Sequence, residues 1–268
     1  MSNPALIVDA GVATVAAGPT NTAVVVGAGS TFTVRNAALG SGVYLNDAWR
    51  ESAHAGRFNI TSPNLVPVSN GIRVQTPSGL ADFNLPYDWS QPLIPQDNLT
   101  IMDDGTAADV DMVAISTYYE NLPGGGMTLK MPGDISGQID FILGWPVAIT
   151  SSATAGAQNT TVITTTVDSS TANTWYAVLG YLTDTQLGCV GISGVDTSQL
   201  FCGGPGDTSG QRTRRYFADM SLMTGRPCIP LFNAANKANT NIVAVDHAAS
   251  VAANVTLILA QMVGNYTP

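Results

Sequence analysis

The feature of this sequence that most restricts its fold is an ordered internal repeat. The first copy begins with Gln-Pro-Leu-Ile-Pro at 91–95 and continues with apolar runs at 99–103 and 109–115. The second copy begins with Arg-Pro-Cys-Ile-Pro at 226–230 and has its apolar runs at 241–246 and 254–259. The copies are about 135 residues apart at the prolines and about 145 at the final run, which predicts an insertion near 234–240. Self-similarity of this kind indicates two copies of one domain in tandem.

We therefore expect an all-β chain of two tandem jelly-roll-like β-sandwiches or barrels, with the first over residues 1–135 and the second over 136–268. Short β-branched runs, separated by turn signals every 8–12 residues, predict about sixteen strands. Eight strands in each half is the number of a jelly roll. Proline lacks the N–H that a central strand needs, so we expect structural corners or edges at Pro92, Pro95, Pro227 and Pro230.

Helices are expected to be few and short. The segment 46–56 is the best candidate in the first half, and the segment 211–223, which has amphipathic spacing, is the candidate in the second. We expect no signal peptide, because the first residues lack a positive charge and Asp9 and Gly11 interrupt the first apolar run. We expect no membrane-spanning helix, because no apolar run approaches 18 residues.

Charged residues make up only 11% of the chain, whereas about 25% is typical of soluble domains. A surface with so few charges is poorly protected against self-association, so it indicates either contact with other subunits or a secreted β protein with a Thr- and Asn-rich surface. The net charge of −9 and the absence of a basic stripe argue against direct nucleic-acid binding. The densest basic segment contains Arg212, Arg214 and Arg215, and it is more typical of a subunit contact or a salt-bridged segment.

The three cysteines do not form a disulfide framework, because their number is odd. Cys189 and Cys202 could pair, but buried free thiols are favoured for these two and for Cys228. No zinc-ligand spacing occurs, and His54 and His247 are interpreted as turn or surface histidines.

The residues offer little for catalysis. There is no Gly-x-Ser-x-Gly, His-Glu-x-x-His or P-loop lysine motif, so we expect neither an enzyme nor a cofactor. The run at 207–210 (Asp-Thr-Ser-Gly) has no equivalent in the first half, which argues against an aspartic protease. Four carboxylates lie within nine residues and could bind calcium, although a solvated turn beside an exposed strand face is favoured: Asp103, Asp104, Asp109 and Asp111.

Taken together, the duplication, the low charge, the small polar side chains and the lack of a catalytic set resemble the double jelly-roll major capsid proteins of tailless icosahedral viruses, including phages with an internal membrane. The resemblance implies a structural protein that forms homotrimers of pseudo-six-fold shape, since two similar domains in each of three subunits tile a hexagonal lattice. It implies a place in the virion shell, synthesis in the host cytoplasm, contacts with other virion proteins and proximity to an internal viral membrane. Under it, we expect Arg212, Arg214 and Arg215 at subunit contacts.

Two alternatives remain open from the sequence. One is another virion component, such as a tail-tube or spike protein, which would form rings or fibres. The other is a secreted carbohydrate-binding β-sandwich module, which would need several exposed aromatic side chains on one face.

Overall fold

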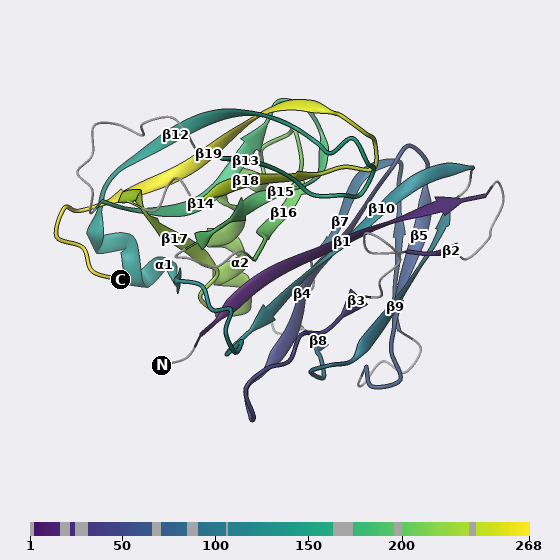
Figure 1. Cartoon of the computed structure of the whole chain (residues 1–268), viewed down its shortest axis with the longest axis horizontal. Coiled ribbons are helices and arrows are strands. Elements are labelled where there is room, and N and C mark those ends of the chain that lie inside the picture. Colours follow the sequence, from purple (N-terminus) through teal and green to yellow (C-terminus); the bar gives the residue numbers. More distant parts are fainter. Residues whose placement is uncertain are drawn as a thin grey trace.

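The computed structural model describes residues 3–16, 22–24, 32–65, 71–84, 91–105, 107–162, 174–195, 200–235 and 240–268. Two β bodies lie side by side, one built from the first half of the chain and one from the second (Figure 1). Among the described residues, no helix is long and apolar enough to cross a membrane.

The first body consists of two antiparallel sheets. Its strands are β1 (Ala5–Val15), β2 (Thr22–Ala23), β3 (Phe32–Thr33), β4 (Val43–Ser52), β5 (Gly56–Thr61), β6 (Ile72–Thr76), β7 (Gly79–Asn84), β8 (Gln91–Pro92), β9 (Asn98–Gly105) and β10 (Asp109–Tyr119). One sheet has the order β1-β10-β4-β7, with β8 also paired to β4. The other has the order β2-β9-β5-β6, with β3 also paired to β9.

The second body repeats this plan. Its elements are β11 (Leu129–Lys130), α1 (Pro132–Ile135), the 3-10 turn η1 (Ser136–Gln138), β12 (Ile139–Thr150), β13 (Asn159–Val162), β14 (Trp175–Thr183), β15 (Leu187–Ser193), β16 (Cys202–Gly206), the 3-10 turn η3 (Thr213–Arg215), α2 (Tyr216–Thr224), β17 (Ile229–Asn233), β18 (Asn241–Val245) and β19 (Ala252–Met262). The sheets have the orders β11-β17-β14-β19-β12 and β13-β18-β15-β16.

Both bodies have the same nested strand pairing. The first long strand pairs with the last, as β1 with β10 and β12 with β19. The pairs inside these are β2 with β9 and β13 with β18, then β4 with β7 and β14 with β17, and finally β5 with β6 and β15 with β16. Eight strand positions in two facing sheets form a jelly roll, so the predicted fold class is confirmed. The division at residues 135 and 136 stays a prediction; β11 already pairs with β17 of the second body.

The repeat found in the sequence falls on equivalent strands. The runs at 99–103 and 109–115 lie in β9 and β10, and the runs at 241–246 and 254–259 correspond to β18 and β19. Facing sheets bury apolar side chains inside each jelly roll, such as Phe58 and Ile60 in the first and Phe232 and Leu257 in the second. All three cysteines are buried free thiols, as favoured from the sequence.

One helix prediction is confirmed and the other is wrong. The segment 211–223 contains η3 and α2, and α2 ends at Gly225, whose φ of 65° suits a left-handed helix cap. The segment 46–56 is not helical, because most of it forms β4, which is hydrogen-bonded to β10 on one side and to β7 on the other. Pairing along both edges and burial on both faces outweigh the local preference of a charged segment.

Candidate functional site

The most extensive feature outside the two cores is the junction between the jelly rolls. The outer face of the β1-β10-β4 sheet packs on the outer face of β15 and β18 through a second apolar cluster. Its buried members are Val8, Ala10, Trp49, Met112, Ala114, Cys189, Phe201, Val243 and Val245. Backbone contact reinforces this packing, because the Val8 N–H donates to the Phe201 carbonyl at 2.9 Å. The junction is therefore a continuous buried interface within one chain.

Strand β4 supplies the polar groups of the junction. Because side chains alternate along a strand, Asp47, Trp49 and Glu51 face the second jelly roll while Arg50 points into the first. The Tyr216 hydroxyl donates to Oδ2 of Asp47 at 3.1 Å. Burial, together with the Asp47 carboxylate, raises the pKa of Tyr216 well above its ordinary value, so this hydroxyl stays protonated.

A three-residue cluster lies where β4 meets the end of β18. Nδ1 of His247 is 3.1 Å from Oε2 of Glu51 and 3.4 Å from Oδ1 of Asp246. Glu51 and Asp246 are 1% and 3% exposed. Burial, and then the nearby Glu51 charge, raises the pKa of Asp246 to about 6. The Glu51 carboxylate beside His247 raises the pKa of that imidazole. The interpretation of His247 as a simple surface residue therefore misses two carboxylates at contact distance.

The acidic run between β9 and β10 is built around Arg50. Its Nε donates to Oδ1 of Asp103 at 3.0 Å and its Nη2 to Oδ2 of Asp111 at 2.6 Å, with all three side chains at most 1% exposed. Desolvation raises the pKa of Asp103. The expectation of a solvated turn is thus wrong for these two carboxylates, because a buried guanidinium from β4 draws them inward.

The other two carboxylates of the run have separate partners. Oδ2 of Asp104 is 2.6 Å from Nη2 of the half-exposed Arg57. Oδ2 of Asp109 accepts the Ala53 N–H at 3.1 Å. The four acids therefore serve three different structural contacts.

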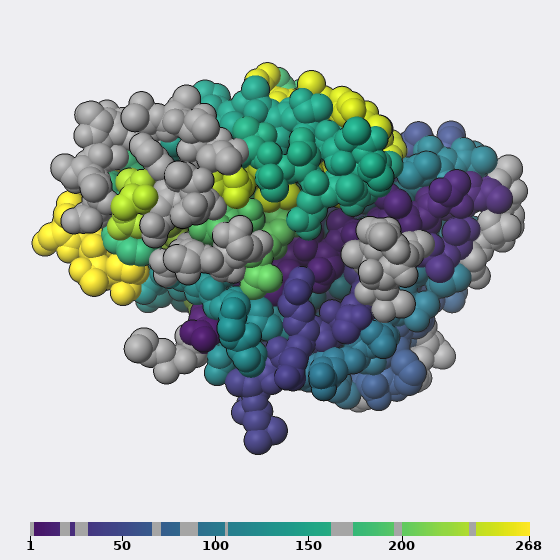
Figure 2. Space-filling view, in the orientation of Figure 1, coloured from purple at the N-terminus to yellow at the C-terminus, as the bar shows by residue number. Residues whose placement is uncertain are grey.

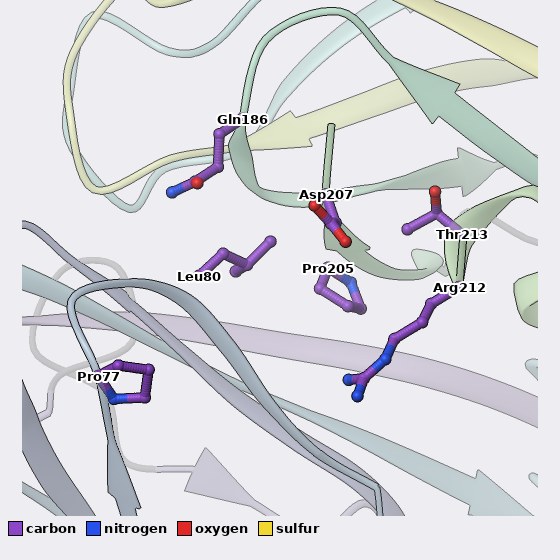
Figure 3. Close-up of a pocket in the computed structure, with 7 residues that line it drawn as sticks. All are labelled: Pro77, Leu80, Gln186, Pro205, Asp207, Arg212 and Thr213. Atoms are coloured by element: carbon purple, nitrogen blue, oxygen red, sulfur yellow. The ribbon is translucent and has the colours of Figure 1, made fainter. Parts of the chain in front are cut away.

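A polar pocket of about 350 Å³ opens beside the junction (Figure 3). It is lined by Pro77 and Leu80 of the first jelly roll and by Gln186, Pro205, Asp207, Arg212 and Thr213 of the second. Asp207 is engaged locally, because its Oδ1 accepts the Ser209 N–H at 2.9 Å. The 207–210 run is accordingly a turn at the pocket wall, and Arg212 is the cation that lines the pocket.

The structure separates the three predicted contact arginines. Arg212, Arg214 and Arg215 are all exposed on or next to η3. Arg212 extends toward the pocket (Figure 3), whereas Nη2 of Arg215 lies 3.2 Å from Asp219. Their role at subunit contacts stays a prediction.

The four predicted corner prolines occupy different settings. Pro92 lies in β8, opposite Tyr44, and Pro95 follows it in the next turn. Pro227 precedes β17, and the buried Pro230 lies within β17 opposite Leu129. Their role as rigid corners also stays a prediction.

One sheet face of the second jelly roll is open. In the β12–β19 pair, the outward positions that are not buried are Ile142, Gly144, Pro146, Ala148, Thr150, Ala252, Asn254, Thr256 and Ile258. None of these is charged, and Ile142 is 59% exposed. The atoms of β12 and β19 lie along the surface at the top of Figure 2, in teal and yellow. This face corresponds to the β1–β10 face that the junction buries in the first jelly roll.

No protein-family model matches the chain, and no curated protein matches it. Among solved structures, it is similar to the major capsid protein P2 of bacteriophage PM2, with 8% identity, a TM-score of 0.28, and coverage of 98% of this chain and 100% of that one. It is also similar to VP54 of PBCV-1, fitted into a reconstruction of the virophage Sputnik, with 7% identity, a TM-score of 0.22, and coverage of 100% and 98%.

A third similar chain comes from Sulfolobus turreted icosahedral virus, with 10% identity, a TM-score of 0.25, and coverage of 100% of this chain and 82% of that one. The chain thus resembles double jelly-roll capsid proteins in architecture alone. The fold assignment rests on its own strand pairing.

Proposed function

We propose that this protein is a virion coat subunit that assembles with copies of itself into an icosahedral shell. The observation that carries the proposal is the unequal use of two equivalent faces. The outer β1–β10 face is buried under the second jelly roll, whereas the outer β12–β19 face is open and carries a charge only at its margin, where Asp184 accepts a hydrogen bond from Asn254. Open apolar faces of this kind are typical of subunit contacts.

The packing within the chain indicates which surface would cover the open β12–β19 face. Within the chain, a β1–β10 face packs on the β18–β15 face of the next jelly roll. Because the two jelly rolls share one topology, the β12–β19 face is suited to pack on the β9–β5 face of another copy. A contact between two different surfaces closes into a ring when its rotation allows. Six jelly rolls from three chains would form such a ring, which is the pseudo-hexameric trimer.

The receiving face of the first jelly roll is polar. Arg57, Asn59, Arg73 and Met102 line a hollow of about 110 Å³ on the outer face of β5, β6 and β9. Arginine and methionine are enriched in protein interfaces, where long side chains adapt to a partner. Under this proposal, the guanidinium groups donate to carbonyl oxygens along the free edge of β12 of the neighbour.

The carbohydrate-binding alternative finds less support. Trp49 is fully buried and Trp145 is 5% exposed, so these two side chains do not supply a stacking platform. As a coat protein, the chain would be made in the host cytoplasm and would lie in the virion shell, in contact with other virion proteins.

The test is the solution mass by light scattering, with electron microscopy of the same sample. Trimers with a hexagonal outline, or closed shells, are expected. A monomer of 27.7 kDa that stays monomeric as the concentration rises would contradict the proposal.

A further inference from the structure

Glu51, Asp246 and His247 bring three metal-ligand side chains, two carboxylates and one imidazole, to one point between the jelly rolls. Glu51 lies in β4 of the first, and the other two directly follow β18 of the second. One donor atom from each lies within 4.8 Å of the others. Nδ1 of His247 lies 3.1 Å from Oε2 of Glu51 and 3.4 Å from Oδ1 of Asp246. Four donors at the usual zinc bond lengths sit about 3.3 Å apart, so these distances match one coordination shell.

The cluster contains a buried oxygen without a hydrogen bond. Oε2 of Glu51 has no hydrogen-bond partner among the described residues, although Glu51 is 1% exposed. Nδ1 of His247 likewise lacks an aligned partner within the described part of the chain. Leaving such atoms without an aligned hydrogen bond is costly, and the two lie only 3.1 Å from each other.

Neighbouring groups hold the two carboxylates in this orientation. Nε2 of Gln186 donates to Oε1 of Glu51 at 3.0 Å, which leaves Oε2 facing the cluster. The backbone N–H of Gly188 donates to Oδ2 of Asp246 at 3.2 Å, and Oδ1, which accepts the Ala248 N–H at 2.7 Å, lies 3.4 Å from Nδ1 of His247. A Cβ on Gly188 would lie 2.5 Å from Oε2 of Glu51, so any larger residue at this position would have to displace the Glu51 carboxylate. Such outer contacts are a regular part of metal sites.

The charges of the cluster favour a cation. Two buried carboxylates face one imidazole, so even a protonated His247 leaves one negative charge uncompensated. A divalent ion would neutralise both acids and leave the imidazole neutral, as a ligand requires.

We propose that Glu51, Asp246 and His247 form a binding site for a divalent transition-metal ion, zinc above others, that joins the two jelly rolls. Imidazole and carboxylate ligands suit zinc, whereas calcium and magnesium prefer oxygen alone. His247 is 24% exposed at its side chain, which leaves room for water as the fourth ligand. Because the ligands come from both halves, the ion would stabilise the junction itself.

The test titrates ZnCl2 into the full-length protein after dialysis against EDTA. Calorimetry is expected to show one zinc ion per chain. Zinc at about 100 times Kd should raise Tm by roughly 5–10 °C, because the ion binds the folded chain alone. The same concentration of CaCl2 should leave Tm unchanged. No zinc binding at micromolar concentration, or an equal response to calcium, would overturn the proposal.

The second histidine provides a matched control. His247→Gln should weaken zinc binding at least tenfold, whereas His54→Gln should bind as the unmodified protein does. Equal affinities in the two variants would overturn the assignment. If His247→Gln fails to fold, the His54→Gln variant still tests the site. His247 is then the one histidine in the chain, so the imidazole signals in its NMR spectrum belong to His247. Zinc must shift those signals, and unshifted signals count against the site.

Discussion

Trp49 of the first jelly roll donates its indole hydrogen to the backbone carbonyl of Gly188 in the second, with 2.7 Å between Nε1 and O. The indole is fully buried in the apolar cluster of the junction. Apolar packing has little directional preference, whereas a hydrogen bond fixes distance and angle. This contact therefore sets how one jelly roll is seated on the other.

Trp49→Phe should lower the free energy of unfolding by about 1–3 kcal/mol, because it removes the donor and leaves the Gly188 carbonyl buried without it. Urea unfolding followed by far-UV circular dichroism measures the change. Trp175→Phe is the control, since Trp175 is half-buried in β14, outside the junction cluster. An equal loss of unfolding free energy in both variants would show that the Trp49 indole stabilises the fold through its volume and not through its hydrogen bond.

The buried Arg50 supports a second prediction. Arg50→Met keeps most of the side-chain volume but leaves Asp103 and Asp111 without their cation, so it should cost about 3–5 kcal/mol. The triple variant Arg50→Met, Asp103→Leu, Asp111→Leu should recover most of this loss, because no buried charge then remains unpaired. Chemical denaturation of both variants checks the pair of expectations.

A matched control for Arg50 lies on the surface of the same jelly roll. Arg57 pairs with Asp104 at 2.6 Å but is 45% exposed at its side chain. Arg57→Met should therefore cost less than about 1 kcal/mol. A cost similar to that of Arg50→Met would mean that burial does not decide the strength of these pairs.

The strand plan of the chain could be predicted from the sequence because the repeat is carried by alternation and turn residues. Those signals are local, and they located β9, β10, β18 and β19 correctly. Strand β4 could not be recognised in this way. It is buried on both faces, one against its own jelly roll and one against the other, so Asp47 and Arg50 follow no polar-out pattern.

The contacts across the junction could not be predicted from local sequence patterns either. Glu51 and His247 are nearly two hundred residues apart and belong to different jelly rolls. Metal-ligand spacing within one segment gives no hint of such a pair. The adjacent Asp246 and His247, after an apolar strand that ends buried, are the one local signal that could have marked the position.

The junction also predicts how stability depends on pH. The pKa of Asp246 is raised from 3.8 to about 6, and that of His247 is raised from 6.5, so the folded protein binds these protons more tightly than the unfolded chain. The stabilisation from Asp246 is present below about pH 4 and is lost as pH rises through about 6; that from His247 is lost above 6.5. With EDTA present, urea unfolding should show greater stability at pH 5 than at pH 7.5.

The matched variant for this pH dependence is Asp246→Asn, which removes one titrating group. Its stability should change less between the two pH values than that of the unmodified protein. Unfolding free energies that rise from pH 5 to pH 7.5 in the unmodified protein would contradict the direction of both shifts.

Arg214 tests the predicted arginine contact. The residue is exposed on η3, and exposed substitutions usually change stability by less than about 0.5 kcal/mol. Arg214→Glu should therefore fold normally but weaken assembly, since it reverses a charge at the proposed contact. Light scattering measures assembly and circular dichroism measures folding. A variant that neither folds nor assembles would make the residue structural, and one that assembles normally would place it outside the contact.

The open β12–β19 face gives the sharpest test of assembly. Ile142 is 59% exposed near one end of the β12–β19 pair, so Ile142→Glu leaves the core unchanged. A carboxylate there must lose its water when another subunit covers it, which costs several kcal/mol. We expect a folded monomer in place of trimers or shells, by light scattering and electron microscopy. Leu222→Glu is the control, because Leu222 is similarly exposed, at 52%, but lies on α2 and not on β12 or β19. If Leu222→Glu blocks assembly and Ile142→Glu does not, the subunit contact lies at α2.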